Sequence, residues 1–567
     1  MREFLSQWIQ RHQAGEITQA IDFYQEYLIS HPDDINVLQL LGIGFCQLNQ
    51  FTQALETFEH ARKIDPDHPA INNNIGHIFI KQKQFQQGLD YFHLILNNQP
   101  THLGALYNLG LLHYHQKDFT TAESFFYQAA QWHDSNSDVF FNLGLCQFYQ
   151  NQMKNAKRNF KCASKIATND TRILLKLGEC ALQLKQHDEA QIYFEEALSI
   201  KPSFAVYHGL GCAHLGQDRM DDALKYFNEA YDLEPFNFEN CHNIASIHFH
   251  KRELLEALQC WFQCLQMKPD ALETLYNIGV VYQYQNKFSD AKDYFFKVLN
   301  VEPNHHDALF NLGTLALKQN KPKEAITYYQ QVIKINPNNE DVRFLLTALG
   351  EETADTFNQC PKHYVSQLFN DYAPNYDQHL TQVLRYDGHK QLHALIEDTL
   401  EPKKNQWSCI TDLGCGTGLA GPLLAPWTNQ LIGVDCADEM LKIAHKSNDY
   451  QQLIHGYIPD FNWPNEVDLF FLADCAPYIG DLTEVTKHMQ ETLKPEGFIA
   501  LSIEKSKTDN AFQLTPSGRY QHNRTALVDL MSQHGFSLVI SKETHLRYEQ
   551  HNPVTSELFI FKNGSIN

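Results

Sequence analysis

The sequence lacks any long apolar segment. No run approaches the roughly 18 residues that a membrane-spanning helix needs, so no membrane association is expected. The N-terminal stretch MREFLSQWIQRHQAGE is amphipathic and lacks the apolar core and cleavage site of a secretory signal. The 13 cysteines include no CxxC pair and show no regular spacing. These absences predict a cytoplasmic protein with reduced thiols, and no metal site is expected.

Positive charge is also scarce. The chain has 45 Lys and Arg against 67 Asp and Glu, a formal net charge of −22. Both the first 360 residues and the remainder are acidic, so a phosphate backbone would be repelled at long range. Nucleic acid is therefore not expected as a partner. At 567 residues the chain is too long for a single core, which predicts two or more domains.

What the sequence does contain is a repeat. Small residues recur every 34 residues, with one interval of 33, at Ala20, Ala54, Gly88, Ala122, Ala156, Ala190, Ala223, Ala257, Ala291 and Ala325. A second series, from Gly42 to Gly313, lies twelve residues before these positions, and prolines follow the same period. Such a period predicts helix–turn–helix units in which the small residues let the two helices approach closely. The pattern strongly resembles the tetratricopeptide repeat and covers residues 1–339 as ten units, with a capping half-unit and linker at 340–360.

Asparagine recurs at one position of the first helix of these units. Asn74, Asn108, Asn142, Asn243, Asn277 and Asn311 each stand two residues before the small residue of the second series. In repeat proteins such as O-GlcNAc transferase, which this row resembles, asparagines here bind the backbone of an extended peptide. A carboxamide suits that role because it both donates and accepts hydrogen bonds. The alternative is that these side chains bond only to each other or to water.

From about residue 361 short apolar strands alternate with helical segments. The expected strands are 409–413, 430–435, 452–455, 467–473, 497–503, 536–543 and 556–562. This alternation predicts a mainly parallel sheet. No clear helix separates the last two strands, which predicts that they form an antiparallel edge hairpin.

The first of these strands runs into the glycine-rich sequence DLGCGTG. Gly414, Gly416 and Gly418 allow the backbone to approach a ligand and to adopt positive φ angles. Asp435 ends the second strand, where a carboxylate can bind both hydroxyls of a ribose. A dinucleotide fingerprint would require a small residue at position 419, which is Leu419. The spacing therefore favours a different adenosine-containing cofactor.

Together with Asp412, the glycine sequence resembles motif I of the Rossmann-like methyltransferases that use S-adenosylmethionine. The resemblance implies that the loop surrounds the methionine part of the cofactor and that Asp435 binds the ribose. It also implies that Met440 packs against the adenine, although Met440 could equally be a core residue. Where relatives carry an aspartate that binds the adenine amino group, this chain has Tyr457 and Asp460 as candidates.

Three further segments resemble predicted bacterial methyltransferases that carry tetratricopeptide repeats. They are LFNDYAPNYDQHL at 368–380, YIGDL at 478–482 and PSGRYQH at 516–522. The first predicts a helical flap over the cofactor, in which Tyr372, Tyr376 and His379 take part and Tyr376 lies near the sulfonium. The predicted fold class is an α-solenoid, the tetratricopeptide superhelix, followed by an α/β Rossmann-like methyltransferase domain at 361–567.

The fourth strand ends at Asp474, and chemistry in such sheets occurs at the carboxyl ends of the strands. Asp474 and Tyr478 are therefore expected to face the transferable methyl group, unless Asp474 is simply a turn residue. Tyr520 and Arg519 are expected on a loop after the fifth strand, where Arg519 would bind a substrate carboxylate or phosphate, or else pair with Asp474 or Glu504. Asp474 and His522 are the candidate bases.

These patterns predict an S-adenosylmethionine-dependent methyltransferase with an attached array that binds an extended peptide or protein. The expected substrate is a protein held in the groove of the array. Two alternatives remain: a methyltransferase for a small carboxylate compound that uses the repeats only for docking, and a scaffold whose cofactor domain no longer transfers methyl. A glycosyltransferase is disfavoured, because about 200 residues with one Rossmann pattern are too few for two catalytic lobes.

Overall fold

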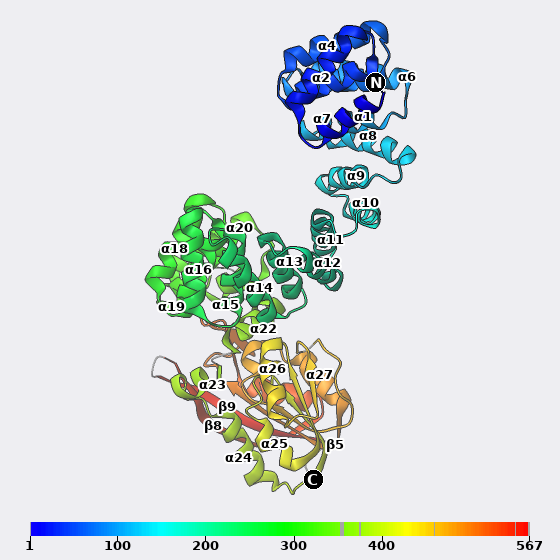
Figure 1. Ribbon diagram of the computed structural model, residues 1–567. Helices are drawn as coiled ribbons and strands as arrows, with labels where there is room; N and C mark the ends of the chain where they lie inside the picture. The colour runs from blue at the N-terminus through cyan, green and yellow to red at the C-terminus, as the bar shows by residue number, and fades with distance from the viewer. Residues whose placement is uncertain (1, 352–356, 374–375, 459, 550–551, 565–567) are drawn as a thin grey trace. The chain divides into compact units, whose positions relative to one another are not determined.

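A computed structural model describes residues 2–351, 357–373, 376–458, 460–549 and 552–564. Its contacts form two compact units, residues 1–274 and 275–567 (Figure 1). The first unit consists of antiparallel helical pairs. The second contains the last repeats, a capping helix and the sheet domain. None of the described helices combines the length and apolar character of a membrane span.

The first unit contains eight helical pairs and the start of a ninth. The helices are α1 Arg2–Gln13, α2 Ile17–Ser30, α3 Ile35–Gln47, α4 Phe51–Ile64, α5 Pro69–Lys81, α6 Phe85–Asn98, α7 Leu103–His115, α8 Phe119–Trp132, α9 Ser137–Tyr149, α10 Met153–Ile166, α11 Thr171–Gln183, α12 His187–Ile200, α13 Phe204–Leu215, α14 Met220–Leu233, α15 Phe238–His250 and α16 Leu254–Met267. The pairs confirm the helix–turn–helix interpretation of the 34-residue period.

The small residues of the period lie where the two helices of a unit touch. A Cβ on Gly42 would come within 2.3 Å of the Phe58 ring, and the same clash recurs in other units, for example between Gly110 and Phe126. The aromatic ring therefore fills the space that the glycine leaves on the facing helix. Phe58 and Phe126 are fully buried, so each unit has the interior that the sequence pattern predicts.

The array continues into the second unit with α17 Leu272–Tyr284, α18 Phe288–Val301, α19 His306–Lys318, α20 Pro322–Ile335 and the capping helix α21 Glu340–Ala348. With these helices, the described residues contain ten helical pairs followed by one further helix, α21. The Asn339 side chain caps α21 by accepting a hydrogen bond from the backbone N–H of Val342.

The sheet domain follows in the same unit. Its helices are α22 Lys362–Tyr372, α23 Tyr376–Gln378 with the π-helical turn His379–Val383, α24 Gly388–Leu400, α25 Gly421–Leu424, α26 Asp438–Ser447, α27 Thr483–Thr492 and α28 Arg524–Gln533. Its strands are β1 Trp407–Leu413, β2 Thr428–Asp435, β3 Gln452–His455, β4 Val467–Leu472, β5 Leu493–Glu504, β6 Phe512–Leu514, β7 Tyr520–His522, β8 Phe536–Glu549 and β9 Asn552–Asn563.

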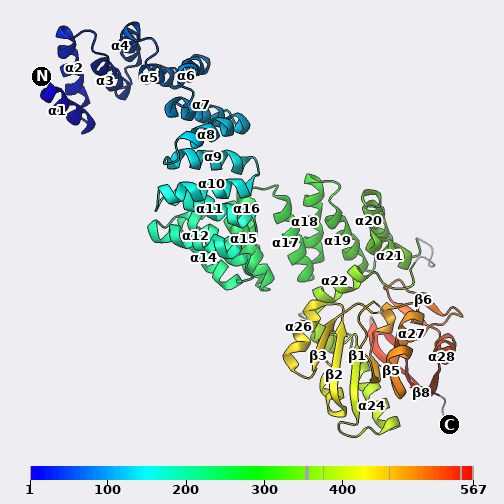
Figure 2. The ribbon, with the colours of Figure 1, turned by 90° about the vertical axis from the view of Figure 1, so that its right-hand side faces the viewer.

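Seven of the strands form one sheet in the order β3-β2-β1-β4-β5-β9-β8 (Figure 2). The first five are parallel, and β9 is antiparallel to both neighbours. The register places Ile410 of β1 opposite Leu431 of β2 and Leu469 of β4, all fully buried. The predicted mainly parallel sheet with an antiparallel edge hairpin is confirmed, with β9 inserted between β5 and β8.

Two apolar layers cover the sheet. Leu392 and Ile396 of α24 belong to the core on one face, and Val485 of α27 and Leu527 of α28 belong to the core on the other. A second, two-stranded sheet, β6–β7, was not predicted from the sequence. The prediction that Tyr520 lies on a loop after the fifth strand is therefore wrong, because β7 begins at this residue.

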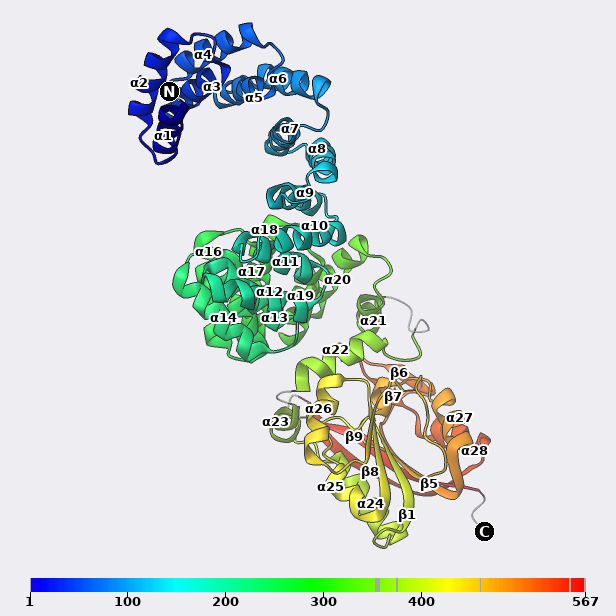
Figure 3. The same cartoon turned by 45° about the vertical axis from the view of Figure 1, so that its right-hand side comes forward.

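The last repeats and the sheet domain share a hydrophobic core. Phe344 of α21 is fully buried, and its ring lies 5.3 Å from that of Tyr364 in α22 and 6.4 Å from that of Tyr520 in β7. Figure 3 shows α22 between the end of the array and the sheet. Asp371 of α22 also accepts a hydrogen bond from the Tyr284 hydroxyl of α17, at 3.3 Å.

Candidate functional site

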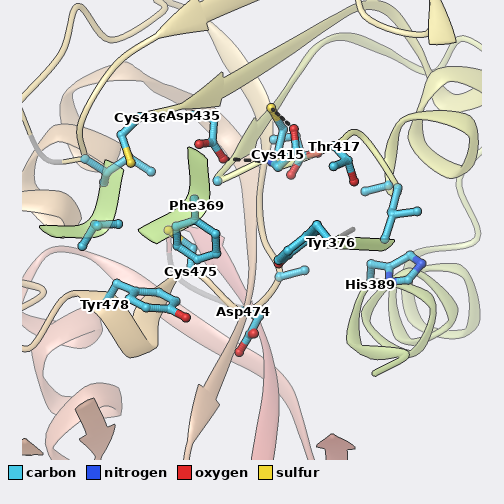
Figure 4. Close-up of a pocket in the computed structure, with 18 of the residues that line it drawn as sticks. Phe369, Tyr376, His389, Cys415, Thr417, Asp435, Cys436, Asp474, Cys475 and Tyr478 are labelled. Atoms are coloured by element: carbon cyan, nitrogen blue, oxygen red, sulfur yellow. Dashed lines mark hydrogen bonds between the residues drawn. The ribbon is translucent and has the colours of Figure 1, made fainter. Parts of the chain in front are cut away.

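A cavity lies at the carboxyl ends of β1, β2 and β4. Asp435 and Thr417 line one side, Asp474 and Tyr478 line the opposite side, and the ring of Tyr376 projects between them (Figure 4). These side chains come from four separate segments of the chain. The parallel sheet brings them together because its strands all end at the same edge.

The glycine sequence forms the turn after β1. Gly414, Gly416 and Gly418 have φ angles of 75°, 54° and 90°, which residues with a Cβ rarely adopt. The cavity is lined by Gly414 and Gly416, whereas Gly418 packs against Ala444 and Tyr450. A Cβ on Gly416 would meet only the Tyr376 ring, at 3.8 Å, so the space in front of this backbone belongs to the cavity.

Asp435 ends β2 and fixes the glycine turn. One carboxylate oxygen accepts the backbone N–H of Gly416 at 2.9 Å, and the other accepts that of Ala437 at 2.9 Å. Burial raises the pKa of Asp435, and the N–H groups of Ala437 and Gly416 oppose that rise. The carboxylate lines the cavity and retains lone pairs for further donors.

Asp412 lies one residue before the end of β1. It is 2% exposed, and one of its carboxylate oxygens accepts a hydrogen bond from the Tyr450 hydroxyl at 2.7 Å. Burial raises the pKa of Asp412 to about 7, against the opposing effect of this hydrogen bond. Tyr450 was not predicted from the sequence, because its contact with β1 arises only when β2 and β3 pair.

The aromatic lead-in reaches the cavity. Tyr376 and Phe369 both line it, with ring centroids 5.9 Å apart. Thr417 of the glycine turn donates a hydrogen bond to Asp377, which fastens α23 to that turn. Met440 of α26 is fully buried and packs in a cluster with Phe369 and Tyr376, outside the residues that line the cavity. Tyr372 stacks on His379 beside this segment.

The turn after β4 presents Asp474 with a φ of 60°, an uncommon conformation for aspartate. The backbone N–H of Asp474 donates to the Ser502 hydroxyl at 2.9 Å, which holds the turn against β5. Its side chain is 16% exposed and lines the cavity together with Tyr478. The strand end therefore positions a carboxylate and a phenol side by side.

Arg519 connects these groups below the cavity. Its guanidinium donates to Asp474 at 2.6 Å, to Glu504 at 2.6 Å and to the Tyr478 hydroxyl at 2.6 Å. A second guanidinium, of Arg547, lies 2.8 Å from Glu504. Both predicted pairings of Arg519, with Asp474 and with Glu504, are thus present at once. Arg547 was not predicted, since it comes from near the end of the long edge strand β8.

Tyr520 and His522 do not line the cavity. The Tyr520 hydroxyl donates to the backbone carbonyl of Phe357 at 3.0 Å, and its ring is fully buried. The Nε2 of His522 lies 2.9 Å from the carbonyl oxygen of Ile479, and burial lowers the pKa of His522 to about 4. The structure therefore does not bring His522 together with Asp474 as a base.

The turn after β3 contributes one of its two candidates. Tyr457 lines the cavity and donates its hydroxyl proton to the backbone carbonyl of Cys360. Asp460 is exposed and is not among the lining residues. Among the described residues, no group of three or more His, Cys, Asp or Glu side chains could hold a metal ion.

The asparagines of the array bond across neighbouring units. The carboxamide nitrogens of Asn108, Asn142, Asn243 and Asn311 lie 2.9–3.4 Å from side-chain atoms 35 residues earlier, which belong to Asn73, Tyr107, His208 and Tyr276. Asn74 and Asn277 are partly buried at the equivalent position. At least one amide N–H of each of these four residues is therefore engaged within the array.

Comparisons with known proteins also distinguish a helical array from a methyltransferase domain. A family model described as a methyltransferase domain matches residues 411–501. A model described as the C-terminal domain of cilia and flagella-associated protein 70, a tetratricopeptide-type domain, matches residues 94–343.

Three curated relatives each match a quarter of this chain or less. An uncharacterized methyltransferase of Schizosaccharomyces pombe is 28% identical over 22% of this chain and 50% of its own length. The malonyl-[acyl-carrier protein] O-methyltransferase of Priestia megaterium is 27% identical over 25% and 51%. The ubiquinone biosynthesis O-methyltransferase of Idiomarina loihiensis is 26% identical over 20% and 54%. The chain thus spans about half the length of these relatives.

Solved structures resemble the helical part. YrrB, described as a TPR protein with an unusual peptide-binding site, aligns with a TM-score of 0.29 at 20% identity and covers 35% of this chain and 97% of its own. The Cut9–Hcn1 assembly aligns with a TM-score of 0.33 at 12% identity, over 61% and 96%. These superpositions are loose, and no functional conclusion rests on them. The chain therefore combines a tetratricopeptide-type helical array with a Rossmann-like methyltransferase domain.

Proposed function

We propose that this protein transfers a methyl group from S-adenosylmethionine to a protein partner that its repeat array holds. The observation that carries the cofactor assignment is the cavity itself. It combines a glycine turn, the carboxylate of Asp435 at the end of β2, and the Asp474–Tyr478 pair at the end of β4. The position of these groups matches the chemistry of a nucleoside joined to a reactive sulfonium.

The lining residues fit such a cofactor. The Asp435 carboxylate can accept hydrogen bonds from two ribose hydroxyls while it keeps its backbone donors. Tyr457 and Ile458 offer flat and apolar contacts for an adenine. The backbone in front of Gly416 is open to the cavity, which leaves room for the methionine part.

When bound, the cofactor supplies an electrophilic methyl group, and the protein supplies alignment and electrostatics. The Tyr376 ring lies inside the cavity, where an aromatic face favours a cation such as a sulfonium. Asp474 orients the acceptor by taking a hydrogen bond from it. We assign no role in methyl transfer to His522, because its Nε2 lies within hydrogen-bond distance of a backbone carbonyl away from the cavity.

A protein substrate is supported by the asparagine row. Its carbonyl oxygens recur along first helices of the array and can accept backbone N–H groups of an extended chain without regard to sequence. The last of these helices, α17 and α19, pack in the same unit as the methyltransferase domain. The alternatives are a small-molecule methyltransferase that uses its repeats for docking, and a scaffold that binds the cofactor without transfer.

The cofactor assignment is tested by calorimetric titration of the full chain with S-adenosylmethionine. Asp435→Asn keeps the shape of the side chain but removes its charge and one of the two oxygens that accept backbone N–H groups. We expect about 2 kcal/mol weaker binding, roughly 30-fold in Kd. Asp438→Asn is the matched control, because the Asp438 side chain is 65% exposed and does not line the cavity. Equal affinity of both variants would refute the ribose assignment.

The protein substrate is tested separately with labelled cofactor. The full chain and its Asn108→Ala/Asn277→Ala variant are incubated with cell lysate, and the label is followed in proteins and in small molecules. Labelled protein that decreases at least fivefold in the variant supports a held substrate. Label found in small molecules only, and equal for both chains, contradicts it.

A further inference from the structure

Carboxyl groups line the cavity, but no cationic side chain does so among the described residues. Among the described residues that line it, the carboxylates are Asp412, Asp435 and Asp474, and there is no lysine or arginine. The one lining histidine, His389, is 5% exposed, and burial lowers its pKa to about 4, so it is neutral near pH 7. An anion that entered here would meet no resident positive charge.

The nearest guanidinium groups are already engaged below the cavity. Arg519 binds Asp474, Glu504 and the Tyr478 hydroxyl, each at 2.6 Å, and its side chain is 8% exposed. Arg547 binds Glu504 at 2.8 Å and is 6% exposed. Two arginines thus face two carboxylates, and the cluster is balanced. Arg519 does not line the cavity, so to reach a substrate anion it would have to move away from these buried carboxylates, which is costly.

Asp474 and Tyr478 favour a group that donates a hydrogen bond over an anion. Asp474 lines the cavity, and a carboxylate only accepts hydrogen bonds. Tyr478 accepts a hydrogen bond from Arg519, so its own hydroxyl proton can be donated to an acceptor atom with a lone pair. A group that satisfies both must carry a proton for Asp474 and a lone pair for Tyr478. Amines, amides and hydroxyls do so, whereas carboxylates and phosphates do not.

We infer that the methyl acceptor is an uncharged N–H or O–H group with a free lone pair, held by Asp474, and is not a carboxylate or a phosphate. This rests on the proposed methyl transfer and narrows its substrate class. In the step, the acceptor lone pair forms the bond to the methyl carbon, and the electron pair of the broken carbon–sulfur bond stays on sulfur. The proton of the acceptor then leaves to solvent, or remains where the product is an ammonium.

A methyl acceptor of this kind would distinguish the protein from a carboxylate methyltransferase. The Priestia megaterium relative is named for O-methylation of a malonyl group. Its similarity covers about half of that enzyme. Arg519, Glu504 and Arg547 all lie outside the residues 411–501 that the methyltransferase family model matches. The balanced cluster is therefore a property of this chain that the family match does not determine.

The experiment uses the full chain, tritiated S-adenosylmethionine and lysate from cells that make the protein. Products are split in two, and one half is treated with mild base. Carboxyl methyl esters then release volatile methanol, whereas N-methyl and ether O-methyl groups keep their label. We expect at least 90% of the transferred label to survive. Base-labile label in the majority would overturn the inference, and no transferred label at all would contradict the proposed function instead.

A variant provides the second measurement. Asp474→Asn is nearly isosteric, so the full chain should fold, which its thermal midpoint verifies. We expect transfer to fall at least tenfold while the affinity for S-adenosylmethionine stays within threefold. Glu484→Gln is the matched control, because Glu484 lies on α27 with a side chain 64% exposed. Transfer by Asp474→Asn equal to that of the control would show that Asp474 does not hold the acceptor.

Discussion

Phe344 provides a sharp test of where the methyltransferase unit begins. This residue belongs to the capping helix of the array, yet its ring packs between Tyr364 of α22 and Tyr520 of β7 and is fully buried. Truncation to alanine removes a fully buried aromatic ring and leaves a cavity, a change that typically costs about 3–5 kcal/mol. In a unit of this size, such a loss lowers the melting temperature by roughly 6–10 °C.

The assay is calorimetric unfolding of the full chain with and without S-adenosylmethionine. A saturating ligand stabilises only the unit that binds it, by about 4 kcal/mol at a thousandfold excess over Kd. The transition that shifts with cofactor therefore identifies the unit with the cavity. We expect Phe344→Ala to lower that transition.

Phe58→Ala is the matched control. Phe58 is equally buried and packs against Gly42 in the first unit. It should lower the transition that does not respond to cofactor and leave the other unchanged. If Phe344→Ala left the cofactor-dependent transition within 2 °C of the wild-type value, the array and the domain would be separate folding units and our reasoning would be wrong.

Two further predictions concern pH. Burial raises the pKa of Asp412 to about 7, so its folded state binds more protons than the unfolded state, and stability falls as pH rises from about 4 to 7. In urea unfolding, Asp412→Asn should gain stability relative to wild type across that range and then stay level. His522 behaves oppositely: its pKa is lowered to about 4, so its contribution is lost as pH falls from about 6.5. His522→Gln should remove this loss, and identical pH profiles would contradict the assignment.

The repeat could be predicted from the sequence because its physics is local. A small residue on one helix and an aromatic residue sixteen positions later on the next specify the close contact, as in Gly42 and Phe58. The same spacing recurs in Gly313 and Tyr329. Nothing distant in the chain is needed to form these pairs, so a period in the sequence is enough to place them.

The position of the glycine turn beside Asp435 was also predictable. The turn with Gly414 and Gly416 follows directly from β1, and Asp435 ends the adjacent parallel strand. A strand that ends in a glycine turn and a neighbour that ends in a carboxylate must meet at one edge of the sheet. Sequence distance between the two segments matters little, since parallel pairing fixes their register.

The Asp474 end of the cavity was only partly predictable, because its two arginines come from outside the parallel strands. Arg519 directly precedes β7, and Arg547 lies in β8 and reaches Glu504 of β5 across the inserted strand β9. The hairpin β6–β7 carries Tyr520 into the core shared with Phe344. Neither placement follows from local hydrophobic pattern, so the balance of charge around Arg519 could not be derived from the sequence.

In the second unit, the repeat array contacts a helix that lines the cavity. Asn277 and Tyr284 lie seven residues apart on α17, two turns along one face of the helix. The Tyr284 hydroxyl donates to Asp371 of α22, and Phe369 from the same helix lines the cavity. The helix face that carries the asparagine thus continues into a contact with the lead-in over the cavity. A chain bound along that face would end against a helix that lines the cavity, which gives a physical reason for the two folds to share one polypeptide.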